Sequence, residues 1–192
     1  YELRPGRADA LLSQIATSMI AVWRRRCQRL FLGTVRGYGL LNQLMLKRLA
    51  KQPKPRTAGA LRVAAFELIE STRHGEDRNA VIVHHAVETA KATLPRPEQK
   101  LVNAVLRRFC EDLAEVFDAP PCAETLALPN WLWQRWQQQL GPEAALAYAQ
   151  WALEPPDVYL RWRAAEPLPP ELTATRWPGF AQPTSGKWEA ID

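Results

Sequence analysis

The most regular pattern of apolar residues in the chain lies between Pro97 and Phe117. Lys100, Arg107 and Arg108 lie off the apolar stripe of this segment, where they can stay solvated or meet a polyanion. Because a helix of this kind is stable only when its apolar face is buried, the pattern predicts the central helix of an all-α domain. The apolar positions share one helical face: Leu101, Val102, Val105, Leu106, Phe109, Leu113, Val116 and Phe117.

Weaker helical patterns precede this segment. Gly37-Tyr38-Gly39 predicts a break between two of them, and prolines at 53 and 55 predict another. Thr57 and Asn79 stand at positions where a side-chain oxygen can cap a following helix. The predicted elements are one or two helices over 7–38 and single helices over 40–50, 58–72 and 80–93.

The composition of the chain changes near Asp118-Ala119-Pro120-Pro121, where two prolines must end the preceding helix. Of 16 prolines 11 follow residue 118, and 7 of 8 tryptophans follow residue 130. We therefore expect three parts: a helical domain over 1–118, a Pro/Trp-rich helical linker over 119–155, and the incomplete beginning of a small domain over 156–192.

The part after the boundary predicts less regular structure. Asn130 opens one helix that Gly141-Pro142 ends, and a second helix runs from Glu143 to about Leu153. Residues 158–163 alternate apolar with polar, which predicts about one strand of a small α+β domain. The remainder shows no strong period, and Trp177, Phe180 and Trp188 have no evident core there. These three aromatic residues suggest a further domain beyond those present here.

Charge is divided unevenly between the two halves. Residues 1–117 hold 20 Lys and Arg against 11 Asp and Glu, whereas residues 118–192 hold 5 against 9. The basic excess therefore belongs to the helical domain, and a basic domain favours a polyanionic partner.

Arginines are the candidates for contact with such a partner. A triplet at 24–26 is the most concentrated group, and its guanidinium groups offer planar forks of donors to phosphate oxygens. The alternative is a solvated helix face, and the sequence does not separate the two. The residues predicted to contact RNA phosphates are Arg24, Arg25, Arg26, Arg29, Arg36, Arg107 and Arg108.

The sequence does not support a membrane-spanning, secreted or metal-binding protein. No apolar run is long enough to span a membrane, and no signal peptide opens the chain. The three cysteines form no C-x-x-C pair, which is typical of reduced thiols in a cytoplasmic protein. His84 and His85 point about 100° apart on a helix and cannot easily chelate one metal ion. We expect no metal, no membrane and a cytoplasmic location.

Three segments resemble the NusB-like RNA-binding fold. Residues 60–68, A-L-R-V-A-A-F-E-L, resemble its L-x-x-x-x-Y-E/Q-L helix, with Phe66 in place of the aromatic residue. Residues 86–91, A-V-E-T-A-K, follow in the expected order. Residues 101–109, L-V-N-A-V-L-R-R-F, resemble its V-N-[AG]-V-L-R segment and are the most specific of the three.

Later residues resemble one branch of that fold, the RsmB (Sun/Fmu) 16S ribosomal RNA cytosine-C5 methyltransferases. L-P-N-W-L at 128–132 resembles the H/L-P-x-W-L entry of these enzymes, and P-P-D-V-Y-L-R-W at 155–162 resembles the P-P-x-x-L-R element before their catalytic domain. The chain departs from them at residues 80–89, where the usual H-A-A-V-N-E-A-V-E-L reads A-V-I-V-H-H-A-V-E-T.

The resemblance implies a module that binds RNA, in particular small-subunit ribosomal RNA, and positions it for a methyltransferase. The S-adenosylmethionine segment D-L-C-A-A-P-G-G-K is absent from this chain, so the cofactor and the catalysis are expected in a separate catalytic domain. Cys122 follows D-A-P-P but lacks the surrounding cofactor fold, and we interpret it as a linker thiol.

Two rival functions remain open. One is a NusB-like protein-interaction or transcription antitermination module without enzymatic role, with the Trp-rich tail as the interface for a protein partner. The other is a DNA-binding helical domain, which ranks last because no helix-turn-helix recognition helix is evident.

Overall fold

The computed structural model describes residues 7–16, 19–46, 48–114, 122–123, 125–154, 156–163 and 166–185. The chain divides into two compact units, Tyr1–Leu153 and Glu154–Asp192. The first unit is helical and the second holds a small β-sheet, so the predicted all-α fold class with a small strand-containing end is confirmed.

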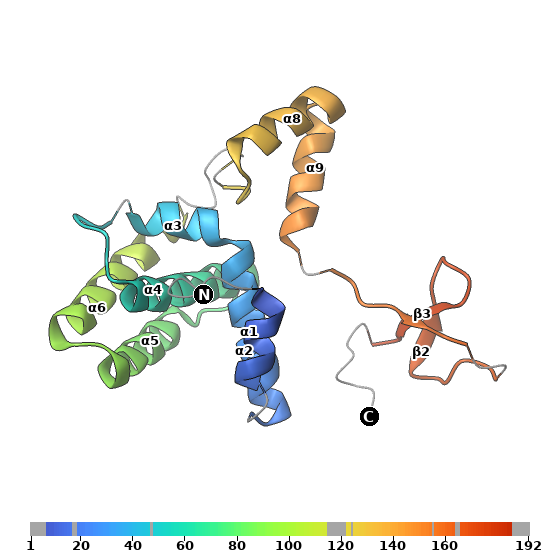
Figure 1. Cartoon of the computed structure of the whole chain (residues 1–192), viewed down its shortest axis with the longest axis horizontal. Helices are drawn as coiled ribbons and strands as arrows, with labels where there is room; N and C mark the ends of the chain where they lie inside the picture. Colours follow the sequence, from blue (N-terminus) through green and yellow to red (C-terminus); the bar gives the residue numbers. More distant parts are fainter. Residues whose placement is uncertain are drawn as a thin grey trace. The chain divides into compact units, whose positions relative to one another are not determined.

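The described helices of the first unit follow one another along the chain (Figure 1). They are α1 (Ala8–Ala16), α2 (Ala21–Arg36), α3 (Tyr38–Leu46), α4 (Pro55–Arg73), α5 (Asn79–Thr93), α6 (Arg96–Glu111), α8 (Asn130–Leu140) and α9 (Pro142–Leu153). Helix α4 packs against α2, α3, α5 and α6 and is therefore the element around which the other helices gather.

The core lies where α3, α4, α5 and α6 meet. Its largest fully buried side chains are Phe109, Leu41, Leu61, Leu68, Leu106 and Val102. Small residues of α4, among them Ala64 and Ala65, are also buried and allow the neighbouring helices to approach closely. The apolar stripe predicted for α6 thus faces this core.

Helix α6 is shorter than the sequence pattern predicts. It runs from Arg96 to Glu111, and Asp112 takes up a turn conformation with φ −92° and ψ 1°. The apolar pattern continues past this turn because Leu113 is buried in the same core. The predicted extension to Val116 and Phe117 lies outside the described residues.

The break expected over Gly37-Tyr38-Gly39 is narrower than predicted. Only Gly37 lies between α2 and α3, and its N–H donates to the Gly33 carbonyl at 2.9 Å. The N–H of Leu41 in turn donates to the Gly37 carbonyl at 2.9 Å, so hydrogen bonding continues across the join. Helix α3 consequently begins at Tyr38 rather than at residue 40.

Both predicted helix caps are wrong. Lys54 and Arg78 stand at the N-cap positions of α4 and α5, and neither helix has a side-chain cap. Thr57 lies inside the first turn of α4, fully buried, where its hydroxyl donates to the Glu98 carboxylate. Asn79 is the first residue of α5, and its buried Oδ1 has no hydrogen-bond partner among the described residues.

Glu98 joins the beginnings of α4 and α6. Its carboxylate accepts hydrogen bonds from the Thr57 hydroxyl and from the Lys54 ammonium, whose nitrogen lies 2.8 Å away. These two donors favour the charged form and lower the pKa of the Glu98 carboxyl. The contact fixes two helix starts that are 41 residues apart in the chain.

Replacing Glu98 with Gln is expected to make the chain less sensitive to acid. Because the folded pKa is lowered, the carboxylate stabilises the fold above its ordinary pKa of about 4.3, and this contribution disappears as the pH falls through the folded value. The native chain should therefore lose more melting temperature than Glu98→Gln between about pH 5 and pH 3. Equal losses in thermal scans followed by circular dichroism would contradict this role.

Gly33 allows α2 to cross α4 closely. A Cβ at this position would lie 2.0 Å from Cζ of Phe66, so the ring occupies the space of the missing side chain. Phe66 is the aromatic residue of the motif at residues 60–68, and it is half-buried against the core. Phe66 thus packs where α2 crosses α4 and fixes the distance between these two helices.

Helices α8 and α9 pack against each other, and their bounds match the predicted ones except that α9 begins at Pro142 rather than at Glu143. Gly141 separates them with φ +80°, a conformation that residues with a Cβ rarely adopt. Ala145 and Ala149 are fully buried, whereas Trp131, Tyr148 and Trp151 are largely exposed. This pair lies within the first compact unit.

The second unit holds a three-stranded antiparallel sheet. Its strands are β1 (Leu160–Arg161), β2 (Leu172–Ala174) and β3 (Phe180–Pro183), in the order β1-β3-β2. The sequence predicted only β1, as a longer strand over 158–163. Strands of two to four residues are too short to show an alternating pattern, and prolines interrupt the segment that contains them.

Candidate nucleic-acid interface

The arginine triplet lies on α2, and its three side chains differ in their contacts. Arg24 and Arg25 are exposed, and a guanidinium N–H of Arg24 donates to the Met19 carbonyl at 3.0 Å. Arg26 is half-buried and pairs with Glu67 of α4 at 2.5 Å. The triplet is therefore not one uniform solvated face.

Arg29, the next arginine along α2, also pairs with a carboxylate on α4. Arg29 lies 3.6 Å from a carboxylate oxygen of Glu70, also on α4, while Arg36 is half-buried near the end of α2. The pairs of Arg26 and Arg29 connect α2 with α4, so a phosphate can recruit these two arginines only in competition with a carboxylate. Arg24 and Arg25 are the more accessible members on this helix.

Arg107 and Arg108 lie on α6, which packs against α4 and α5. Both side chains are exposed, and neither has an ion-pair partner among the residues that the structure describes. They are adjacent and therefore point about 100° apart around the helix. The seven predicted arginines thus come from two helices, both packed on α4.

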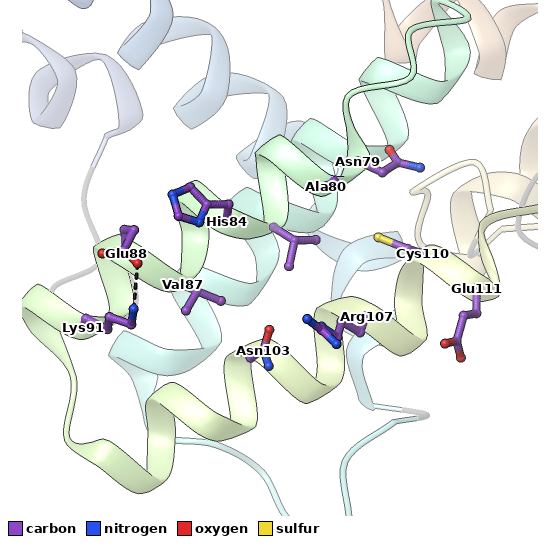
Figure 2. A pocket seen from close by; sticks show the side chains of 11 residues that line it. Asn79, Ala80, His84, Val87, Glu88, Lys91, Asn103, Arg107, Cys110 and Glu111 are labelled. Atoms are coloured by element: carbon purple, nitrogen blue, oxygen red, sulfur yellow. Dashed lines mark hydrogen bonds and ion pairs between the residues drawn. The ribbon is translucent and has the colours of Figure 1, made fainter.

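A groove with a volume of about 640 Å³ lies between α5 and α6 (Figure 2). Val83 and Val87 contribute apolar surface, and Asn103 and Arg107 lie one helical turn apart on α6, facing the groove. Arg107 is the one predicted RNA contact that lines it. The remaining lining residues are Asn79, Ala80, His84, Glu88, Lys91, Cys110 and Glu111.

Two charges of the groove neutralise each other. The Lys91 ammonium lies 2.7 Å from a carboxylate oxygen of Glu88, one turn earlier on α5. The hydrogen bond and the positive charge of Lys91 lower the pKa of the Glu88 carboxyl. This leaves Arg107 as the cation of the groove without such a partner among the described residues.

The sequence did not predict Asn103 or Lys91 as site residues, and it considered His84 only as a metal ligand. Asn103 and Arg107 are four residues apart, the spacing of neighbours on one helix face, and this was the available signal. His84 and Lys91 face the groove only because α5 packs along α6, which the spacing of residues cannot show.

Other basic residues have structural roles. Arg48 donates to Asp112 at 2.5 Å and stacks over the Phe109 ring, with 5.2 Å from its guanidinium carbon to the ring centroid. Arg62 is buried beneath Tyr38 and donates to Asn42 Oδ1 at 2.6 Å, and burial lowers its pKa. These two arginines hold α3 against the core and do not offer a surface for a ligand.

His84, His85 and Cys122 are the other residues that the sequence analysis considered as candidates. His84 and His85 are both exposed, with ring centroids 5.8 Å apart. The described residues contain no cluster of three or more potential metal ligands. Within the same residues, no helix is long and apolar enough to cross a membrane. Cys122 is a free, half-buried thiol 3.5 Å from the Thr125 hydroxyl.

Exposed aromatic residues gather on α8 and α9. Trp131 and Trp151 are 64% and 67% exposed. Tyr148 makes edge contacts with both Trp136 and Trp151, at centroid distances of 5.7 and 5.6 Å. Large exposed aromatic surface is typical of sites that contact another molecule.

The comparisons with known proteins identify the helical domain. The model of the NusB family matches residues 12–111, more than half of the 192 residues, and this range runs from the middle of α1 to the end of α6. A search of curated proteins and a search of solved structures found no match. The chain therefore belongs to the NusB family, and this membership indicates an RNA-binding or transcription-related module.

Proposed function

We propose that this chain is the RNA-binding and substrate-positioning module of a ribosomal RNA (cytosine-C5) methyltransferase of the RsmB type. The observation that carries the proposal is the pair Arg107-Arg108 within the V-N-A-V-L-R segment. Both guanidinium groups are exposed, and neither has a carboxylate partner among the described residues. They lie in a segment of net charge +9, which favours a polyanion.

The residues after the family domain support the choice of parent enzyme. The L-P-N-W-L segment enters α8, and the P-P-D-V-Y-L-R-W segment leads into β1 of the second unit. A free antitermination factor of the family needs neither element. S-adenosylmethionine and the two catalytic cysteines would belong to a catalytic domain, because their segments do not occur in this sequence.

The arginines would bind the RNA backbone and set its orientation. Arg and Lys contacts to phosphates position a nucleic acid without reading its sequence. Selectivity for small-subunit ribosomal RNA would come from the shape of the RNA and from bases splayed out of the helix. In this proposal the present chain binds and orients the RNA, and the catalytic domain of the parent enzyme transfers the methyl group in the cytoplasm.

Replacing Arg107 and Arg108 together with Ala is expected to weaken binding of a small-subunit ribosomal RNA fragment at least about tenfold, because two charge-assisted contacts are lost. A matched variant replaces Arg26 and Arg29, which already pair with Glu67 and Glu70. It should lose less RNA affinity and more thermal stability. Fluorescence anisotropy and thermal melts measure the two effects, and the reverse order would contradict the proposal.

The choice of parent enzyme has its own test. The reading frame of the gene should encode a glycine-rich S-adenosylmethionine segment and two cysteines in P-C and T-C contexts after the residues described here. A gene that encodes none of these would leave RNA binding in place and refute the methyltransferase assignment.

The aromatic surface of α8 and α9 favours a second candidate, a protein-interaction module. Trp131 and Trp151 are exposed to an extent that is unusual for a surface without a partner. Under this alternative, the replacement of Arg107 and Arg108 leaves partner binding unchanged, whereas Trp151→Ala weakens it. The two candidates therefore respond to different substitutions.

A further inference from the structure

The groove between α5 and α6 combines an apolar floor with polar groups that suit one nucleotide. Val83 and Val87 line the groove with apolar surface, which we call its floor. Asn103 and Arg107 supply hydrogen-bonding groups from α6 (Figure 2). Its volume of about 640 Å³ lies within the range of pockets that hold small organic ligands.

We propose that this groove receives one nucleotide of a single-stranded RNA, with its phosphate on Arg107 and its base over Val83 and Val87. The inference rests on the proposed RNA-binding function and names the place where the RNA is held. Arg107 can offer a phosphate two parallel N–H donors, since its guanidinium has no ion-pair partner among the described residues.

The charges of the lining favour a nucleotide over a simple anion. Lys91 and Glu88 form a pair at 2.7 Å, and Glu111 adds a carboxylate near the other end of the groove. The groove therefore has no overall positive excess to concentrate a small anion. A nucleotide gains additional contacts, because its base can cover the apolar floor while its phosphate meets Arg107.

Asn103 provides the contact that a base edge requires. Its side-chain amide carries both donors and an acceptor, and it lies one turn from Arg107 on the same face of α6. Single-stranded RNA presents such edges, because its bases can be splayed away from their neighbours. Asn103 and Arg107 can thus hold the base and the phosphate of the same nucleotide.

Arg108 is a natural control for this site. It is exposed like Arg107 and carries the same charge on the same helix, but it does not line the groove. General attraction of RNA to a basic surface should depend on both arginines equally. A nucleotide in the groove should depend on Arg107 much more than on Arg108.

The test measures binding of the full chain to a fluorescein-labelled, uridine-rich single-stranded RNA that contains 4-thiouridine. Arg107→Ala should weaken binding about tenfold, and Arg108→Ala by less than about threefold. Asn103→Asp should resemble Arg107→Ala, because a carboxylate one turn away would pair with the guanidinium. Photocrosslinks should map to peptides of α5 and α6, and circular dichroism should show unchanged helix content.

The possible results distinguish the nucleotide site in the groove from the proposed RNA-binding function. Equal losses for Arg107→Ala and Arg108→Ala, with crosslinks outside α5 and α6, would overturn the nucleotide site and leave RNA binding intact. No binding of the RNA by the native chain would overturn both the nucleotide site and the proposed function.

Discussion

Replacing Phe109 with Ala is expected to destabilise the helical unit by about 3–5 kcal/mol. Phe109 is completely buried and belongs to the core formed by α3, α4, α5 and α6. The substitution removes a large apolar surface and leaves a cavity, because the surrounding helices can collapse into it only in part.

A second effect adds to this loss. The Arg48 guanidinium stacks over the Phe109 ring at 5.2 Å while it pairs with Asp112 at 2.5 Å. Without the ring, this largely buried cation loses one of its contacts. Urea unfolding followed by the helical circular dichroism signal measures the change in free energy of unfolding.

Leu101→Ala serves as the control, since Leu101 lies on the same helix but is only half-buried. Its effect should be clearly smaller than that of Phe109→Ala. A loss of less than about 1 kcal/mol for Phe109→Ala would show that the ring does not fill the core as described.

The buried face of α6 was predictable because its apolar positions repeat along the helix, but its predicted central place was wrong, since the other helices pack around α4. Val102, Val105, Leu106 and Phe109 are all buried, as their spacing predicts. The end of the helix was not predictable, since Leu113 stays in the core beyond the turn at Asp112 and preserves the period. The pattern reports which residues are buried and does not report where the backbone bends.

The polar contacts that hold the helices together depend on residues far apart in the chain. Thr57 reaches Glu98, and Arg26 reaches Glu67, each across 41 residues. A threonine before a helix predicts a cap, but α4 begins at Pro55, so Thr57 lies inside its first turn and its hydroxyl donates to the half-buried Glu98 carboxylate instead. Such pairings follow from the packing of α2 and α6 on α4, which the sequence alone does not reveal.

The candidate site, like the fold, could be predicted from the sequence only in part. The sequence identified seven arginines on two helices, and the structure distinguishes exposed members such as Arg107 from Arg26, which is paired with Glu67. The groove itself was not predictable, because seven of its lining residues come from α5 and four from α6. The predicted RNA contacts stay predictions until binding is measured.

RNA binding is expected to weaken steeply as salt is added. Arg24, Arg25, Arg107 and Arg108 are exposed, and we expect each of them to contact one phosphate. Each phosphate that they neutralise releases counterions, which lowers log K by about 0.7 per tenfold increase in salt for a single strand. Four contacts therefore predict a loss of about 50-fold in affinity between about 50 mM and 200 mM salt.

The measurement that tests this account most directly is a titration of a labelled single-stranded fragment of small-subunit ribosomal RNA with the full chain at several salt concentrations. The account predicts a linear fall of log K against log salt with a slope of about −3, and a slope smaller in magnitude by about 1.4 when Arg107 and Arg108 are both Ala. Binding that is weak and insensitive to salt would contradict it.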